Sequence, residues 1–213
     1  VFSDSTKGWI PISDDAVTEA PVAPATQRAI FGYGSTGTPR VSLTNLVNSS
    51  GVVASDVTGV GTARNALAAA GYGGDKGLFG YGYGSSSYQS ITNLISNSGV
   101  VASDTSGVGT ARNYLAASSY GGDKAIFGYG FTGSRVSMTN LVNSSGVVAS
   151  DVTGVGTGRS DLAAASYGGD KALFGYGTTG TRVSLTNLVS NLGVVASDTT
   201  GVGTARWGLA AAG

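Results

Sequence analysis

The sequence predicts an all-β protein, a β-propeller made of four-stranded blades. The tetrapeptide Phe-Gly-Tyr-Gly begins at residues 31, 79, 127 and 174, so the steps are 48, 48 and 47 residues. Each step contains four short runs of strand-like composition, separated by turn residues. Glycine occupies 36 of the 213 positions, and no amphipathic window of helical length remains. A fixed repeat of this length is typical of propellers.

Other motifs keep the same step. Thr-Asn-Leu begins at residues 44, 92, 139 and 186, and an arginine follows Gly-Val-Gly-Thr at residues 64, 112, 159 and 206. The copies differ mainly in the segment after Phe-Gly-Tyr-Gly, as residues 35–40 and 83–88 show. Variation confined to one connection indicates a scaffold with changeable loops. Neutral drift in solvent gives the same pattern, and both interpretations stay open.

Four predicted strands make up one repeat, at residues 67–71, 77–81, 90–95 and 99–103. A Gly-Gly-Asp-Lys turn joins the first two strands, and Ser-Asn-Ser-Gly joins the last two. The first run is rich in alanine, and glycines limit it to about five residues, which favours a strand over a helix. Its small side chains suit the innermost strand, where blades converge. A β-solenoid is the rival architecture, but its coils are usually shorter, about 20–30 residues.

One repeat resembles a known family. Arg-x-x-Leu-Ala-Ala-Ala, the Gly-Gly-Asp-Lys turn and Ala-Ile-Phe-Gly-Tyr-Gly together resemble the kelch repeat, over residues 28–213. The resemblance implies an arginine before the inner strand and an apolar strand that ends in glycines. The Tyr and Trp of typical kelch repeats are missing, and Gly-Tyr-Gly replaces Gly-Gly. The chain is therefore similar to a divergent kelch-type blade.

The ends of the repeat array predict how a propeller closes. The first copy lacks its alanine-rich strand, whereas Leu209–Gly213 has the sequence of that strand and nothing after it. We expect this segment to complete the first blade and give four blades. Membership in a longer array, or a larger ring shared by two chains, stays open as the alternative.

Residues 1–27 do not repeat and are expected to be an N-terminal arm and linker. Residues 1–12 have the composition of a strand or anchoring arm, and residues 14–24 that of an extended acidic linker. The arm is expected to bind virion or appendage proteins. Lys7-Gly8-Trp9, joined to these repeats, is similar to stretches of virion-associated or tail-associated proteins of marine bacteriophages, cyanophages especially. That resemblance implies a location on the virion, with the extracellular surface of a cell as the alternative.

Composition excludes several functions. The chain has no Cys and no His, which excludes thiol and imidazole catalysis and the copper site of kelch-type oxidases. Its only glutamate, Glu19, lies in the linker, which argues against a sialidase-like hydrolase. A net charge of zero without a basic block argues against nucleic acid, and no apolar run is long enough for membrane insertion. No cofactor or metal is expected.

Recurring aspartates at residues 56, 104, 151 and 198 have a structural explanation. Repeat symmetry spreads them around the ring, whereas a glycosidase needs two carboxylates in one cleft. We expect them to accept backbone N–H bonds in turns and to pair with the recurring arginines across blades. The Asp-Lys pairs are expected at solvated hairpin tips. Phe79, Tyr81 and their equivalents are expected to pack between blades.

Two sets of residues are candidates for a shallow glycan site. Sugars bind flat aromatic faces together with polar groups. The first set lies at the hairpin turns: Tyr72, Asp75, Tyr120, Asp123, Tyr167 and Asp170. The second set lies in the loops after Phe-Gly-Tyr-Gly: Tyr83, Tyr88, Phe131 and Arg135. The sequence therefore predicts a non-enzymatic structural or adhesive module that binds host-surface glycans. A purely architectural spacer without a ligand is the alternative, and a sialidase-like hydrolase is the least favoured one.

Overall fold

A computed structural model of the chain describes residues 2–4, 8–9, 29–37 and 39–213. The described part is all-β, and it contains no helix that could span a membrane. Two short strands near the N-terminus form one hairpin, and the other eleven strands form four antiparallel sheets. The strands are β1 (Phe2–Asp4), β2 (Gly8–Trp9), β3 (Ala29–Gly32), β4 (Thr44–Val47), β5 (Ala68–Tyr72), β6 (Lys76–Gly80), β7 (Thr92–Ile95), β8 (Ala116–Tyr120), β9 (Lys124–Gly128), β10 (Thr139–Val142), β11 (Ala163–Tyr167), β12 (Lys171–Gly175) and β13 (Thr186–Val189).

Each complete sheet has three strands, in the order expected for the first three runs of one repeat, and the expected four-stranded blade does not form as a regular sheet. In the sheet β5-β6-β7, Ala69 lies opposite Phe79, and Phe79 lies opposite Asn93. The first three predicted strands therefore form within one or two residues of their predicted bounds. The fourth run, residues 99–103, meets β7 at one isolated bridge, Ile95↔Val101, and a second bridge, Thr92↔Thr105, follows just after the run. It is irregular because the chain between these bridges carries an aspartate toward the preceding repeat.

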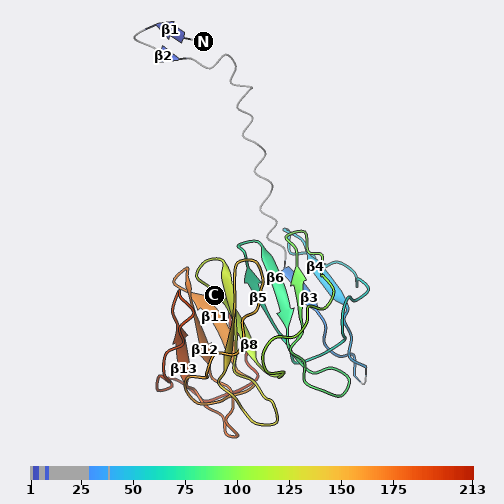
Figure 1. The fold of residues 1–213 in the computed structure, drawn as a ribbon, viewed down its shortest axis with the longest axis vertical. Helices are drawn as coiled ribbons and strands as arrows, with labels where there is room; N and C mark the ends of the chain where they lie inside the picture. The colour runs from blue at the N-terminus through green and yellow to red at the C-terminus, as the bar shows by residue number, and fades with distance from the viewer. Residues whose placement is uncertain (1, 5–7, 10–28, 38) are drawn as a thin grey trace.

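The sheets stack side by side in chain order, from β3-β4 to β11-β12-β13 (Figure 1). The alanine-rich strands β5, β8 and β11 adjoin one another along the stack. Backbone bonds join successive hairpins, since Gly73 N donates to Asp123 O and Gly121 N to Asp170 O, each at 2.7 Å. The small side chains allow this close approach. The arrangement of repeated antiparallel sheets is β-propeller-like.

Phenylalanine rings pack against glycines of the preceding repeat and fill the space between sheets. The Phe127 ring covers Gly80, where a Cβ would lie 2.5 Å from its Cζ atom, and Phe174 covers Gly128 in the same way. Phe127 also meets the Tyr81 ring edge-on, with centroids 5.1 Å apart. Both rings are fully buried. The expectation that these aromatic residues pack between repeats is confirmed for Phe79, Phe127 and Phe174, whereas the equivalent Phe31 is 62% exposed.

The expected closure by the C-terminal segment is not formed in the described structure. Within that part of the chain, β3 pairs with β4 alone. Residues 209–213 form no strand and continue the stack beyond β11, where Gly208 N donates to Asp161 O at 2.9 Å. The segment thus takes the place after β11 that β8 takes after β5. At the N-terminus, Phe2 of β1 lies opposite Trp9 of β2, and the predicted linker at residues 14–24 lies outside the described residues.

Candidate functional site

A buried arginine joins each pair of neighbouring repeats. Arg112 is fully buried, and its guanidinium carbon lies 4.2 Å from the centroid of the Tyr81 ring. Its Nε donates to Tyr129 O at 2.8 Å, and its Nη2 donates to Asn140 Oδ1 at 2.7 Å. The side chain therefore stacks on one repeat and donates hydrogen bonds to the next. Burial lowers the pKa of Arg112 but leaves it a cation.

An aspartate completes this contact. Asp151 accepts from Thr110 N at 3.0 Å, from Thr110 Oγ1 at 2.6 Å and from Asn140 Nδ2 at 2.9 Å, and it lies 3.9 Å from Arg112 Nη1. The expected pairing of arginines with aspartates across repeats is confirmed. The turn that Asp151 binds belongs to the preceding repeat, so the aspartate links two repeats. We call this set an arginine clamp, and the clamps are Arg64/Asn93/Asp104, Arg112/Asn140/Asp151 and Arg159/Asn187/Asp198.

Clamp aspartates have lowered pKa values. Burial alone would raise the pKa of Asp151, but the hydrogen bonds from Thr110 and Asn140 and the charge of Arg112 outweigh burial. A folded-state pKa below the unfolded value adds stability above the unfolded pKa, and this stability is lost as the pH falls through the folded pKa. The pKa values of Asp104 and Asp198 are lowered in the same way, each by the hydrogen bonds and the arginine of its own clamp.

Acid is therefore expected to weaken the stack below the ordinary aspartate pKa of 3.8. Asp151→Asn should reduce the slope of unfolding free energy against pH in that range, because one carboxylate no longer takes up a proton on unfolding. Urea unfolding at a series of pH values measures the slope. Asp123→Asn, which removes an exposed carboxylate 3.1 Å from Lys124, controls for lost net charge. An unchanged slope in Asp151→Asn would contradict this assignment.

The structure places two of the hairpin-turn candidates, Tyr72 and Tyr120, in packing roles. The Tyr72 and Tyr120 rings are buried, 5% and 3% exposed, and they lie against Gly146 and Gly193 of the following repeats. Tyr167 is 37% exposed because no described sheet follows it. Buried rings present no free face to a sugar in this conformation.

Carboxylates of the same set sit at solvated hairpin tips. Asp75 accepts from Asn97 Nδ2 at 3.0 Å, Asp170 accepts from Asn191 Nδ2 at 3.1 Å, and Asp123 pairs with Lys124. All three side chains are more than 40% exposed. The expectation of solvated Asp-Lys tips is confirmed.

The loop candidates come together at the opposite end of the strands. Tyr83 and Tyr88 meet edge-on with centroids 5.4 Å apart, and Tyr88 and Phe131 meet edge-on at 6.2 Å. The Arg40 guanidinium lies 4.7 Å from the Tyr83 centroid. We call Tyr83, Tyr88 and Phe131 the aromatic loop patch. Arg135 is exposed and forms an antiparallel backbone bridge with Phe131 within the third loop.

Sequence reasoning missed a buried polar group beside this patch. Asn113 forms a backbone bridge with Phe131, is 6% exposed, and its Oδ1 has no hydrogen-bond partner within the described residues. In the preceding repeat the equivalent Asn65 Oδ1 accepts from Arg40 Nε at 3.2 Å. Tyr88 stands where Arg40 stands in the first loop. The substitution of that arginine by tyrosine was the available sequence signal.

In the part of the chain that the structure describes, no three acidic side chains gather to form a metal site. Three of the recurring aspartates are bound within the clamps. Comparison with known proteins adds no relative, since no protein-family model and no curated protein matches the chain.

Proposed function

We propose that the chain is a non-enzymatic adhesive module whose aromatic loop patch binds carbohydrate on a host surface. The observation that carries the proposal is the run of three partly exposed rings, Tyr83, Tyr88 and Phe131, supplied by neighbouring loops. Aromatic faces bind the apolar faces of sugar rings, and adjacent polar groups bind the hydroxyls. The four sheets would be the blades of a kelch-like propeller, which presents its variable loops at one end.

Asn113 gives the patch a hydrogen-bonding group. A buried amide oxygen without a partner costs about 1–3 kcal/mol. Because Asn113 Oδ1 is buried in the unbound chain, the loop side chains around it would have to move before a sugar hydroxyl could donate a hydrogen bond to it and remove that cost, as Arg40 does at Asn65. Exposed Arg135 supplies a cation nearby for acidic or hydroxyl-rich sugars.

The chemistry of the other residues supports a role without catalysis. The carboxylates of Asp104, Asp151 and Asp198 accept several hydrogen bonds each, and their arginine partners are fully buried. Such groups serve packing between repeats. A virion or a cell-surface appendage is the setting that we propose, with the N-terminal arm as the attachment to other virion proteins.

Binding to an array of bacterial surface glycans tests the proposal. We expect Tyr88→Ala to weaken binding to the strongest array ligand by about tenfold or more, because it removes the central ring of the patch. Titration of that glycan against the purified chain gives the Kd. Tyr88→Phe retains the ring and is expected to bind within a factor of about two of the unmodified chain.

Tyr167→Ala is the comparison at the other candidate site. Loss of binding in Tyr167→Ala, with Tyr88→Ala unaffected, would place the site at the hairpin turns. Absence of saturable binding to every glycan and to whole cells would overturn the adhesive proposal and leave an architectural spacer.

A further inference from the structure

The two ends of the sheet stack carry complementary halves of the contact that joins neighbouring repeats. The first complementary pair is an aromatic ring and a glycine. Phe79, Phe127 and Phe174 each cover a glycine of the preceding repeat. Phe31, the equivalent ring of the first repeat, is 62% exposed. Gly175, the equivalent glycine of the last repeat, has only Thr186 Cγ2 near its Cβ position within the described residues, at 3.4 Å.

A second pair is a leucine and a glycine. Leu46 lies against Gly99, Leu94 against Gly146, and Leu141 against Gly193. Leu188 of the last repeat is 45% exposed. Gly51 of the first repeat has no described atom within 4 Å of its Cβ position.

The arginine clamp is also divided between the ends. The Arg206 guanidinium stacks on Tyr176 at 4.1 Å, as the other arginines stack on their tyrosines, but its one side-chain hydrogen bond in the described structure runs to Thr204 O. Asn45 and Asp56 of the first repeat are joined by a 2.8 Å hydrogen bond, as Asn140 and Asp151 are. No arginine of the described chain lies in their clamp.

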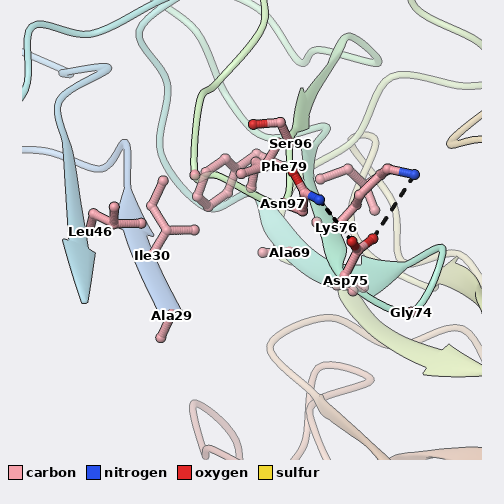
Figure 2. Close-up of a pocket in the computed structure, with 16 residues that line it drawn as sticks. Ala29, Ile30, Leu46, Ala69, Gly74, Asp75, Lys76, Phe79, Ser96 and Asn97 are labelled. Carbon is pink, nitrogen blue, oxygen red and sulfur yellow. Dashed lines mark hydrogen bonds and ion pairs between the residues drawn. The ribbon is translucent and has the colours of Figure 1, made fainter. Parts of the chain in front are cut away.

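The strand edges match as well. Among the described residues, β3 has no alanine-rich neighbour of the kind that pairs with β6, β9 and β12. A cavity of about 700 Å³ opens between β3-β4 and the next sheet, lined by Ile30 and Leu46 on one side and by Ala69 and Phe79 on the other (Figure 2). Leu209–Gly213 has the sequence of the missing strand, and its residues are mostly exposed. The register of β5 on β6 places Ala212 opposite Ile30, as Ala70 lies opposite Leu78.

We propose that copies of this chain associate head to tail, with residues 209–213 of one copy completing the first sheet of the next. In the same contact, Arg206 enters the Asn45/Asp56 clamp, Phe31 covers Gly175, and Leu188 covers Gly51. The partner is a second copy because the segment of the same chain lies against β11, at the far end of the stack from β3. Such a heterologous contact forms a ring when its rotation closes. Two chains supply eight sheets, which is within the range of propellers.

Molar mass in solution tests the association. The unmodified chain, of 21.0 kDa, is expected to give a mass of at least twice that value by light scattering and sedimentation. Arg206→Glu places a carboxylate beside Asp56, and Gly175→Leu fills the place of the Phe31 ring. Each variant is expected to lower the mass to 21.0 kDa with the circular dichroism spectrum unchanged. Arg182→Glu, at an exposed loop arginine, makes the same charge change and should keep the assembly.

A monomer mass for the unmodified chain at all concentrations would overturn the proposal, and so would an assembly that Arg206→Glu and Gly175→Leu both retain. Engineered cysteines give a second readout, since the chain has no cysteine of its own. A mixture of Ile30→Cys and Ala212→Cys chains should form a disulfide-linked heterodimer, because opposed strand residues lie within disulfide range. A chain with both cysteines that cross-links only within itself would establish closure inside one chain instead.

Discussion

Arg112→Ala is expected to lower the free energy of unfolding by about 3–5 kcal/mol, the loss typical of removing one partner from a buried charged network. The substitution leaves Asn140 Oδ1 and Tyr129 O without their donor in a dry contact, and it removes the cation from the Tyr81 ring. Each unsatisfied buried acceptor costs about 1–3 kcal/mol. Urea unfolding gives the free energy, and the melting temperature should fall by about 10 °C for a chain of this length.

Lys124→Ala is the matched control for this substitution. It removes a cation from an exposed ion pair with Asp123, and such pairs contribute about 0–1 kcal/mol. An Arg112→Ala variant as stable as Lys124→Ala would show that the clamp does not hold the repeats together. Arg112→Lys separates charge from geometry, because lysine cannot reach Tyr129 O and Asn140 Oδ1 with one planar group.

Gly80→Ala is expected to cost about 1–3 kcal/mol, the usual range for overpacking a well-packed core. The new methyl group would lie 2.5 Å from Phe127 Cζ and 2.9 Å from Phe127 Cε1. The Phe127 ring has no free space to enter, because it is fully buried against Tyr81 and the neighbouring sheet. Urea unfolding of the purified variant measures the loss.

Gly71→Ala is the control for the general effect of replacing a strand glycine. Its Cβ would meet only Ser119 Oγ at 3.3 Å among close side-chain atoms, and the other repeats carry Ser119 and Ser166 at this position. We expect its stability to change by less than about 1 kcal/mol. Equal losses in the two variants would contradict the proposed packing of rings on glycines.

The repeat, the first three strands of each repeat and the pairing of arginines with aspartates could be predicted from the sequence, whereas the fourth predicted strand was wrong. Periodic glycines and short β-branched runs determine local structure, and these signals lie within one repeat. The recurrence of one arginine and one aspartate per repeat indicated their pairing. The sequence does not show which repeat supplies each partner, because the contact between Asp151 and Thr110 joins residues 41 positions apart.

The candidate site was harder to predict. A tyrosine beside a Gly-Gly turn has the composition of an exposed tip, but Tyr72 and Tyr120 lie against glycines of the next repeat, a contact that depends on how sheets stack. The aromatic loop patch was hard to predict for the same reason, because it brings together residues of separate loops. Asn113 Oδ1 has no hydrogen-bond partner among the described residues because Tyr88 replaces an arginine, and this replacement becomes visible when the loops of the repeats are aligned with one another.

Hydrogen exchange at three equivalent glycine amides tests the stacking of sheets most directly. Gly73 N donates to Asp123 O and Gly121 N donates to Asp170 O, whereas Gly168 N of the last hairpin has no partner within the described chain. If the sheets stack, Gly73 and Gly121 are expected to be strongly protected, approaching the protection of global unfolding, and Gly168 is expected to exchange fast. Fast exchange at all three amides would show that the repeats do not stack.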